Sequence, residues 1–241
     1  MSALLETIAR IRREVCELHA ELTRYGLVVW TAGNVSGRIP GYDLMVIKPS
    51  GVSYDDLTPG LMVVTDLYGT PVSSLSADTD GVPAVWENPD LSPSSDTAAH
   101  AYVYRNMPDV GGVVHTHSTY ATAWAARGEE IPCVLTMMGD EFGGPIPIGP
   151  FALIGDDSIG RGIVETLRGS RSRAVLMGGH GPFTIGRTAR DAVKAAVMLE
   201  DVARTVHVAQ QLGQTWRLDD ADIDQLHDRY QNVYGQQDGN R

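Results

Sequence analysis

Two histidines, His115 and His117, stand one residue apart at the end of the short apolar run GGVV. In a β-strand, successive side chains point to opposite faces, so residues i and i+2 share a face. A strand here would present two imidazoles side by side, as two ligands of a metal site. The same spacing also suits two ordinary polar residues at the mouth of a sheet, and this pair alone leaves the choice open.

A third histidine, His180, lies between glycines in GGHGPF, directly after the apolar run AVLM. Three imidazoles with an open fourth position are typical of a catalytic zinc or a similar divalent metal. Asp96, near the expected start of a helix, offers a carboxylate as a fourth ligand or as a nearby base. Its plainer role, an acid that stabilises the positive end of that helix, is compatible with both. His100, four residues later, could support Asp96 from behind.

Two small, polar, glycine-bearing stretches follow strand-like runs: TAGNVSGR at 31–38 and KPSGVSYDD at 48–56. They supply backbone N–H groups, hydroxyls, the amide of Asn34 and the cation of Lys48, which together could cradle a phosphate. Ser94 and Ser95 would complete such a site if a helix begins there, because helix N-termini attract anions. Taken singly, each stretch is explained by ordinary turn chemistry.

The composition limits the class of protein. A net charge of −11 argues against a general nucleic-acid or anionic-membrane binder, although a local cluster of cations still suffices for one phosphate. No apolar run approaches the roughly 18 residues of a membrane span. The first residues suggest an amphipathic helix rather than a signal peptide, and two cysteines make no disulfide framework. We therefore expect a cytoplasmic protein.

The hydrophobic pattern predicts helices that alternate with short strands. One domain spanning residues 1–241 is expected, since no linker divides the chain. We predict helices over 3–24, about 95–106, 118–126, 156–169, 188–213 and 219–231. Strands are predicted at 27–31, 44–48 and 61–66, and a strand–glycine loop–strand unit around His180. Residues 132–143 are predicted to mix strand and loop, and residues 76–93 to form a surface loop.

Together and in this order, five motifs resemble the class II aldolase/adducin family over residues 3 to about 212. The motifs are GNVSGR, IKPSGVSYDDLTP, SSDTAAH, VGGVVHTHSTYATAWA and GGHGPFTIG. The resemblance implies a single three-layer α/β/α domain around a mostly antiparallel central sheet. It also implies a homotetramer with zinc or manganese in active sites at the subunit interfaces.

Within the family, SSDT, VHTHS, HGPF and the tail ending YGQ look most like the L-ribulose-5-phosphate 4-epimerases. By this resemblance Asp140 and Tyr234 are the catalytic proton donor and acceptor. The resemblance assigns the metal to His115, His117 and His180 with Asp96 beside them, and the sugar phosphate to Gly33, Asn34, Lys48, Ser50, Gly51, Ser94 and Ser95.

The implied reaction converts L-ribulose 5-phosphate into D-xylulose 5-phosphate. The hydrogen on C4 is not acidic, so inversion there needs a retro-aldol cut between C3 and C4, followed by re-formation of the bond on the other face. One alternative is a sugar-phosphate aldolase, similar to fuculose-1-phosphate aldolase, that releases dihydroxyacetone phosphate; the compact stretch 147–164 favours it. A non-catalytic, adducin-like assembly module is disfavoured, because all three histidines are present.

Overall fold

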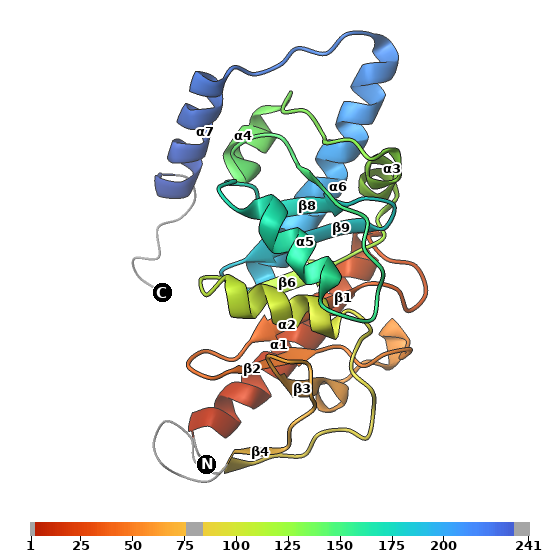
Figure 1. Ribbon diagram of the computed structural model, residues 1–241, viewed down its shortest axis with the longest axis vertical. Helices are drawn as coiled ribbons and strands as arrows, with labels where there is room; N and C mark the ends of the chain where they lie inside the picture. Colours follow the sequence, from red (N-terminus) through yellow and green to blue (C-terminus); the bar gives the residue numbers. More distant parts are fainter. Residues whose placement is uncertain (1–2, 76–83, 234–241) are drawn as a thin grey trace.

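The computed structural model describes residues 3–75 and 84–233 and forms one mixed α/β unit around a central sheet (Figure 1). Its helices are α1 (Ala3–Arg24), α2 (Thr97–Asn106), α3 (Thr119–Arg127), α4 (Thr136–Phe142), α5 (Ser158–Leu167), α6 (Ala189–Leu212) and α7 (Asp220–Asn232). Its strands are β1 (Asn34–Arg38), β2 (Leu44–Ile47), β3 (Val63–Asp66), β4 (Ser74–Leu75), β5 (Ala84–Val85), β6 (Gly112–His115), β7 (Ile148–Gly149), β8 (Ala174–Met177) and β9 (Gly181–Gly186).

The central sheet has the strand order β3-β2-β1-β6-β9-β8-β7, and β4 pairs separately with β5. We expected a mostly antiparallel sheet, and the structure corrects this: the sheet is mixed, because β7 and β8 run parallel beside antiparallel pairs. The parallel pair arises because α5 carries the chain from the end of β7 back to the start of β8, and parallel neighbours need such a crossover.

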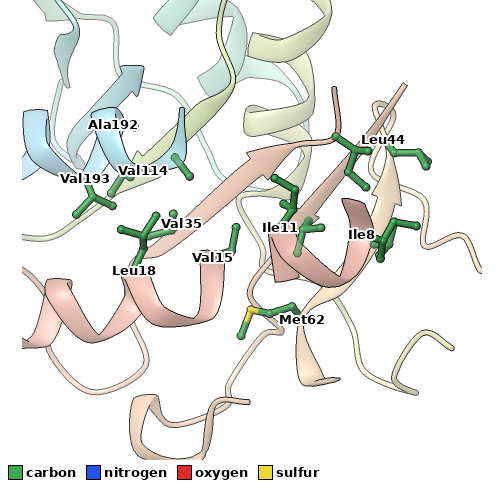
Figure 2. Packing of buried hydrophobic residues seen from close by; sticks show 14 of the residues in the cluster. Ile8, Ile11, Val15, Leu18, Val35, Leu44, Met62, Val114, Ala192 and Val193 are labelled. Atoms are coloured by element: carbon green, nitrogen blue, oxygen red, sulfur yellow. The ribbon is translucent and has the colours of Figure 1, made fainter. Parts of the chain in front are cut away.

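Helices cover both faces of the sheet, and neighbouring strand residues point to opposite faces. Val114 packs in one cluster with α1 and the first turns of α6, as Figure 2 shows. Its neighbour Val113 packs in another cluster with α2 and α5. A third cluster joins α3, α4 and α7 to β8 and the rest of α6, and α7 lies beside α4 in Figure 1. This alternation holds the end of β6 rigidly between two apolar layers.

The predicted helices are confirmed to within a few residues, but two other local predictions are wrong. The apolar stretch 27–31 is not a strand; β1 begins at Asn34 instead, where it pairs with His115. Trp30 has a positive φ of 58° and is 88% exposed, so its apolar character reflects neither a strand nor the core. Residues 136–142 form helix α4 rather than strand and loop.

The predicted surface loop at 76–93 is also only partly described, since residues 76–83 lie outside the described part of the chain. Ala84 and Val85 form a strand with β4, and Trp86 is buried against the α1 cluster. Tertiary contacts with α1 therefore order a stretch that has no periodic pattern of its own. No described helix is both long enough and apolar enough to cross a membrane.

His19 ties α1 to the sheet. Its Nδ1 lies 2.6 Å from the carbonyl oxygen of Val15, to which it donates, and its Nε2 accepts the backbone N–H of Val35 at 3.0 Å. The ring is buried, and burial lowers the pKa of His19 to about 3. The neutral imidazole is therefore a structural group: it accepts the backbone N–H of Val35 and so joins α1 to β1.

Replacing His19 with glutamine is expected to weaken the acid sensitivity of the fold. The pKa of His19 is about 3 in the folded protein and about 6.5 in the unfolded chain. Between these two pH values only the unfolded chain binds a proton at this histidine, so the free energy of unfolding falls as the pH drops. Between pH 7 and pH 5 this one residue should remove about 2 kcal/mol from the free energy of unfolding. Urea unfolding of wild type and of His19→Gln at pH 7 and at pH 5 measures the difference in the free energy of unfolding. A chelator in both samples removes any contribution from bound metal.

The matched control is His207→Gln, because His207 is exposed on α6 and bonds only to Gln211 among the described residues. A change of slope in this control as large as that in His19→Gln would show that the effect does not come from the buried ring. An unchanged slope in His19→Gln would show that His19 does not carry the acid sensitivity.

Candidate metal centre and anion pocket

Three histidines meet where β6 ends and β8 turns into β9. The ligand nitrogens of His115, His117 and His180 all lie within 4.8 Å of one another, and Nε2 of His115 lies 2.9 Å from Nε2 of His117. Tetrahedral zinc with Zn–N bonds of 2.0–2.1 Å separates neighbouring nitrogens by about 3.3 Å. The group therefore has the spacing that a metal ion requires.

The surrounding chain fixes how His115 faces this group. Its Nδ1 lies 3.0 Å from the carbonyl oxygen of Pro182, and its ring stacks on Phe183 with 4.2 Å between centroids. An imidazole that donates from Nδ1 to a carbonyl keeps the lone pair of Nε2 free, which is the usual arrangement behind a metal ligand. At Gly181, the first residue of β9, there is no room for a larger residue, because a Cβ would come within 2.8 Å of the carbonyl oxygen of Thr116.

Burial and neighbouring charges favour the metal-binding form of two of these rings, His115 and His180. Burial lowers the pKa of His115 well below its usual value, and the neighbouring His180 and His117 lower it further. Burial also lowers the pKa of His180, although the charge of Asp96 opposes this. Neutral imidazoles are the ligand form, so the site favours a cation over protons at neutral pH.

Asp96 stands at the N-terminal end of α2 and faces the histidines across the pocket. Its Oδ2 accepts a hydrogen bond of 2.7 Å from the amide of Asn34, whose Nδ2 also lies 2.9 Å from Oγ of Ser94. The other oxygen, Oδ1, is buried and has no partner in the described part of the chain. A buried carboxylate oxygen without a partner is costly, and a metal ion or a substrate hydroxyl at this position would satisfy it.

A pocket of about 290 Å³ opens in front of these residues. It gathers all of the metal and substrate residues predicted above, from five separate segments: Gly33, Asn34, Lys48, Ser50, Gly51, Ser94, Ser95, Asp96, His115, His117 and His180. Thr31, Ala32, Pro49 and Ile154, which the sequence did not single out, also line it. Backbone bonds from Ser50 to Ser92 and from Ser94 to Lys48 hold the polar loops together.

Lys48 is the cation of this pocket, yet only 2% of it is exposed. Its Nζ contacts the carbonyl oxygens of Pro49 at 3.2 Å and Thr31 at 3.5 Å, and lies 5.3 Å from the centre of the Tyr54 ring. Within residues 3–75 and 84–233, no carboxylate forms an ion pair with it. Burial lowers the pKa of Lys48, and an anion in the pocket would restore the stability of its charge.

The glycine at position 33 is required by close packing. Its φ is +79°, and a Cβ there would come within 2.9 Å of the carbonyl oxygen of His115. The loop thus passes directly beside the end of β6, and its residues 31–33 line the same pocket as the histidines and Lys48.

Helix α3, which follows His117, is capped by a residue that sequence reasoning missed. The two carboxylate oxygens of Glu200 on α6 accept the backbone N–H groups of Tyr120 and Ala121, each at 2.9 Å. Ser118 is the N-cap residue, but its side chain makes no capping bond. No local signal could have identified Glu200, because it lies 79 residues away along the chain.

Glu200→Ala is expected to lower the free energy of unfolding by about 2 kcal/mol, because it removes a charged cap that satisfies two helix N–H groups. Glu200→Gln should lose about half as much, since the amide keeps one acceptor. Thermal and urea unfolding measure both. The neighbouring Asp201→Asn, which breaks only an exposed pair with Arg204, should change little; an equal loss in all three variants would contradict the capping role.

The two residues expected to handle protons lie elsewhere. Asp140 is on α4, outside this pocket, and its carboxylate lies 3.3 Å from the guanidinium of Arg229 on α7. Tyr234 falls outside the described residues. The structure therefore brings together the predicted metal and phosphate groups within one chain, but does not bring Asp140 to them.

Comparison with known proteins shows the family of this chain. The family model of the class II aldolase and adducin N-terminal domain matches residues 13–207, so the chain belongs to this family. Similar structures include an L-fuculose 1-phosphate aldolase (23% identity, TM-score 0.78, covering 92% of this chain and 96% of that one). Another L-fuculose 1-phosphate aldolase, from Glaciozyma antarctica PI12, has 17% identity and a TM-score of 0.74, covering 95% and 84%.

A third similar structure is YgbL from Klebsiella pneumoniae, described as an aldolase, epimerase or decarboxylase. It has 24% identity and a TM-score of 0.73, covering 91% of this chain and 99% of its own. At these identities the likeness shows a shared fold. The family and the histidine group together define the protein as a class II aldolase-type chain with a site that could bind a metal ion.

Proposed function

We propose that the protein is an L-ribulose-5-phosphate 4-epimerase, which inverts C4 of its substrate by breaking and re-forming the C3–C4 bond. The observation that carries the proposal is the one pocket in which three histidines, a buried carboxylate and a buried lysine meet. Such a pocket would bind a divalent cation at one end and a phosphate at the other. Family membership supports the reaction class.

The residues present fit a metal ion, because the histidine nitrogens converge and Oδ1 of Asp96 lacks a partner. We propose that His115, His117 and His180 hold zinc, with manganese as the alternative, and that Asp96 lies at the ion. Bound there, the ion would act as a Lewis acid on neighbouring oxygens of the ketose.

The opposite end of the pocket would bind the phosphate. Lys48 supplies charge, while the loops around Gly33 and Gly51 and the hydroxyls of Ser50, Ser94 and Ser95 supply hydrogen-bond donors. Anchoring the phosphate keeps the two-carbon fragment in place after the bond breaks, so that it can turn and present its other face. Asn34 borders both ends and orients Asp96.

The proton donor and acceptor for the C4 oxygen would be Asp140 and Tyr234 of a neighbouring subunit in a homotetramer. Two observations support a shared site: Asp140 lies outside the pocket of its own chain, and large apolar side chains are exposed at the pocket mouth. Ile154 lines the pocket at 52% exposure, with Leu153 (73%) beside it. Exposed apolar residues gathered around a polar pocket are typical of interfaces.

A class II aldolase that releases dihydroxyacetone phosphate is the second candidate, favoured by the fold shared with fuculose-1-phosphate aldolases and by the compact segment containing Ile154. It needs the same metal and phosphate groups but no second proton-transfer residue on the other face. Either enzyme would work in the cytoplasm, in keeping with the two free cysteines.

The test gives the zinc- or manganese-loaded protein L-ribulose 5-phosphate and follows the products by NMR, with a coupled assay for D-xylulose 5-phosphate. Epimer formation that chelator abolishes would support the proposal. Release of dihydroxyacetone phosphate from a ketose 1-phosphate, without epimer, would make the protein an aldolase. A protein that binds no metal and turns over neither sugar would be an adducin-like assembly module.

Mixing two inactive variants tests the shared site. His117→Ala and Asp140→Asn, dissociated and reassembled together, should regain activity, because some sites then combine an intact metal centre with an intact partner's Asp140. Activity that stays at the level of the separate variants would place every catalytic group within one chain.

A further inference from the structure

Behind Asp96 runs a buried row of polar groups that the proposed reaction does not use. His100 and Tyr104 follow Asp96 on α2 at intervals of four residues, and both are fully buried. Oγ of Ser36 lies 2.8 Å from Nδ1 of His100 and 2.8 Å from the hydroxyl of Tyr104. Buried polar side chains cost stability unless they are paired, so a network placed here calls for an explanation.

The geometry of the two elements explains which groups meet. On α2, residues four apart share one face, and on β1, Asn34 and Ser36 share one face. The strand therefore presents Asn34 to Asp96, and Ser36 to the pair of His100 and Tyr104. One helix face carries the carboxylate, and the network continues that face away from the pocket.

Two atoms of this row remain unsatisfied. Nε2 of His100 and Oδ1 of Asp96 are both buried and have no hydrogen-bond partner in the described part of the chain. Both sit on the side of α2 that faces the metal centre: His100 packs edge-on against Phe183, which stacks on His115. A free nitrogen and a free oxygen one helical turn apart are natural partners.

Counting protons decides which of the two atoms donates. The fully buried ring of His100 is neutral and has one N–H, because burying an unpaired charge is costly. The phenol of Tyr104 keeps its proton, since burial raises its pKa. If Tyr104 donates to Ser36, and Ser36 donates to Nδ1 of His100, the imidazole proton must be on Nε2, facing a carboxylate acceptor. The opposite tautomer would turn a nitrogen lone pair toward that carboxylate.

We propose that His100 is a positioning residue, held as its Nε2–H tautomer by Ser36 and Tyr104, which donates to Oδ1 of Asp96 in the metal-loaded protein. The carboxylate is thereby held between Asn34 and His100 and turned toward the three histidines. This inference rests on the proposed metal site and extends it to three residues that touch neither metal nor substrate directly: His100, Ser36 and Tyr104.

The first test measures zinc affinity by competition with a chromogenic chelator, without substrate. His100→Leu is expected to weaken binding about 10- to 100-fold, as loss of a supporting hydrogen bond does. His100→Gln places an amide N–H near the position of Nε2 and should restore affinity to within about threefold of wild type. His100→Leu should have no further effect in an Asp96→Asn background, since the two residues act through one bond.

The second test needs no substitution at His100. The ¹⁵N shifts of the ring should identify the Nε2–H tautomer in wild type, and Tyr104→Phe should shift the ring toward a mixture of tautomers. An Nδ1–H tautomer in wild type, equal affinity in wild type and a folded His100→Leu variant, or failure of the glutamine to restore binding would each overturn the proposal. Wild type that binds no zinc would instead contradict the proposed function.

Discussion

Replacing His117 with alanine is expected to abolish turnover and to weaken divalent-metal binding by more than about 100-fold. The residue provides one of three converging nitrogens, 2.9 Å from that of His115, and no other histidine within the described residues lies close enough to replace it. Because a three-ligand site that loses one ligand keeps neither its geometry nor one of its three bonds to the metal, metal and activity should be lost together. Isothermal titration with zinc, and the epimerase and aldolase assays, measure both.

His207→Ala is the control for removing an imidazole. His207 lies on α6, is exposed, and should affect neither metal binding nor turnover. Circular dichroism and thermal unfolding must show that His117→Ala stays folded, as expected for a side chain that is itself exposed. Retention of stoichiometric metal and full activity in His117→Ala would refute the three-histidine centre.

Lys48→Met is expected to lower kcat/KM for a sugar phosphate by about 100-fold, the magnitude of losing a charged hydrogen bond to a buried phosphate. The same substitution should leave the free protein equally stable or more stable by about 1 kcal/mol. The wild-type ammonium is 2% exposed and pairs with no described carboxylate, so the fold loses little when methionine fills its place. Opposite effects on function and stability are expected where a charge serves a ligand rather than the fold.

The other lysine of the chain, Lys194, supplies the matched comparison. Its Nζ lies 2.9 Å from Oε2 of Glu141, a carboxylate that is fully buried, while Arg173 approaches that residue only to 3.9 Å. Lys194→Met should therefore destabilise the protein by about 2 kcal/mol, because it leaves a buried charge poorly paired.

Urea unfolding of the two free variants, with kinetics on phosphorylated and unphosphorylated sugar, separates these roles. If Lys48→Met impaired both sugars equally, the lysine would not be the phosphate ligand. If it destabilised the free protein as much as Lys194→Met, the ammonium would be part of the fold's own ion pairing.

Much of this molecule is determined by patterns that act over a few residues. The apolar repeat of α1, the two-residue spacing of His115 and His117 at the end of β6, and the polar glycine-bearing stretches that contain Gly33 and Lys48 are all visible in the sequence. Their order along the chain suffices to predict the family, which the family model confirms. These features depend on periodicity and turn chemistry, which neighbouring residues encode directly.

Other features depend on contacts between distant segments, and only the tertiary structure decides them. The strand at Asn34 forms because β6 pairs with it, although the more apolar stretch before it suggested a strand there. Glu200 caps α3 from 79 residues away, and Ser36 meets His100 across 64. No local pattern encodes such pairs, since each partner alone is an ordinary polar residue. The meeting of three histidines with Lys48 in one pocket is likewise a property of the folded sheet: the sequence determined which chemical groups were available, and packing decided which of them face one another.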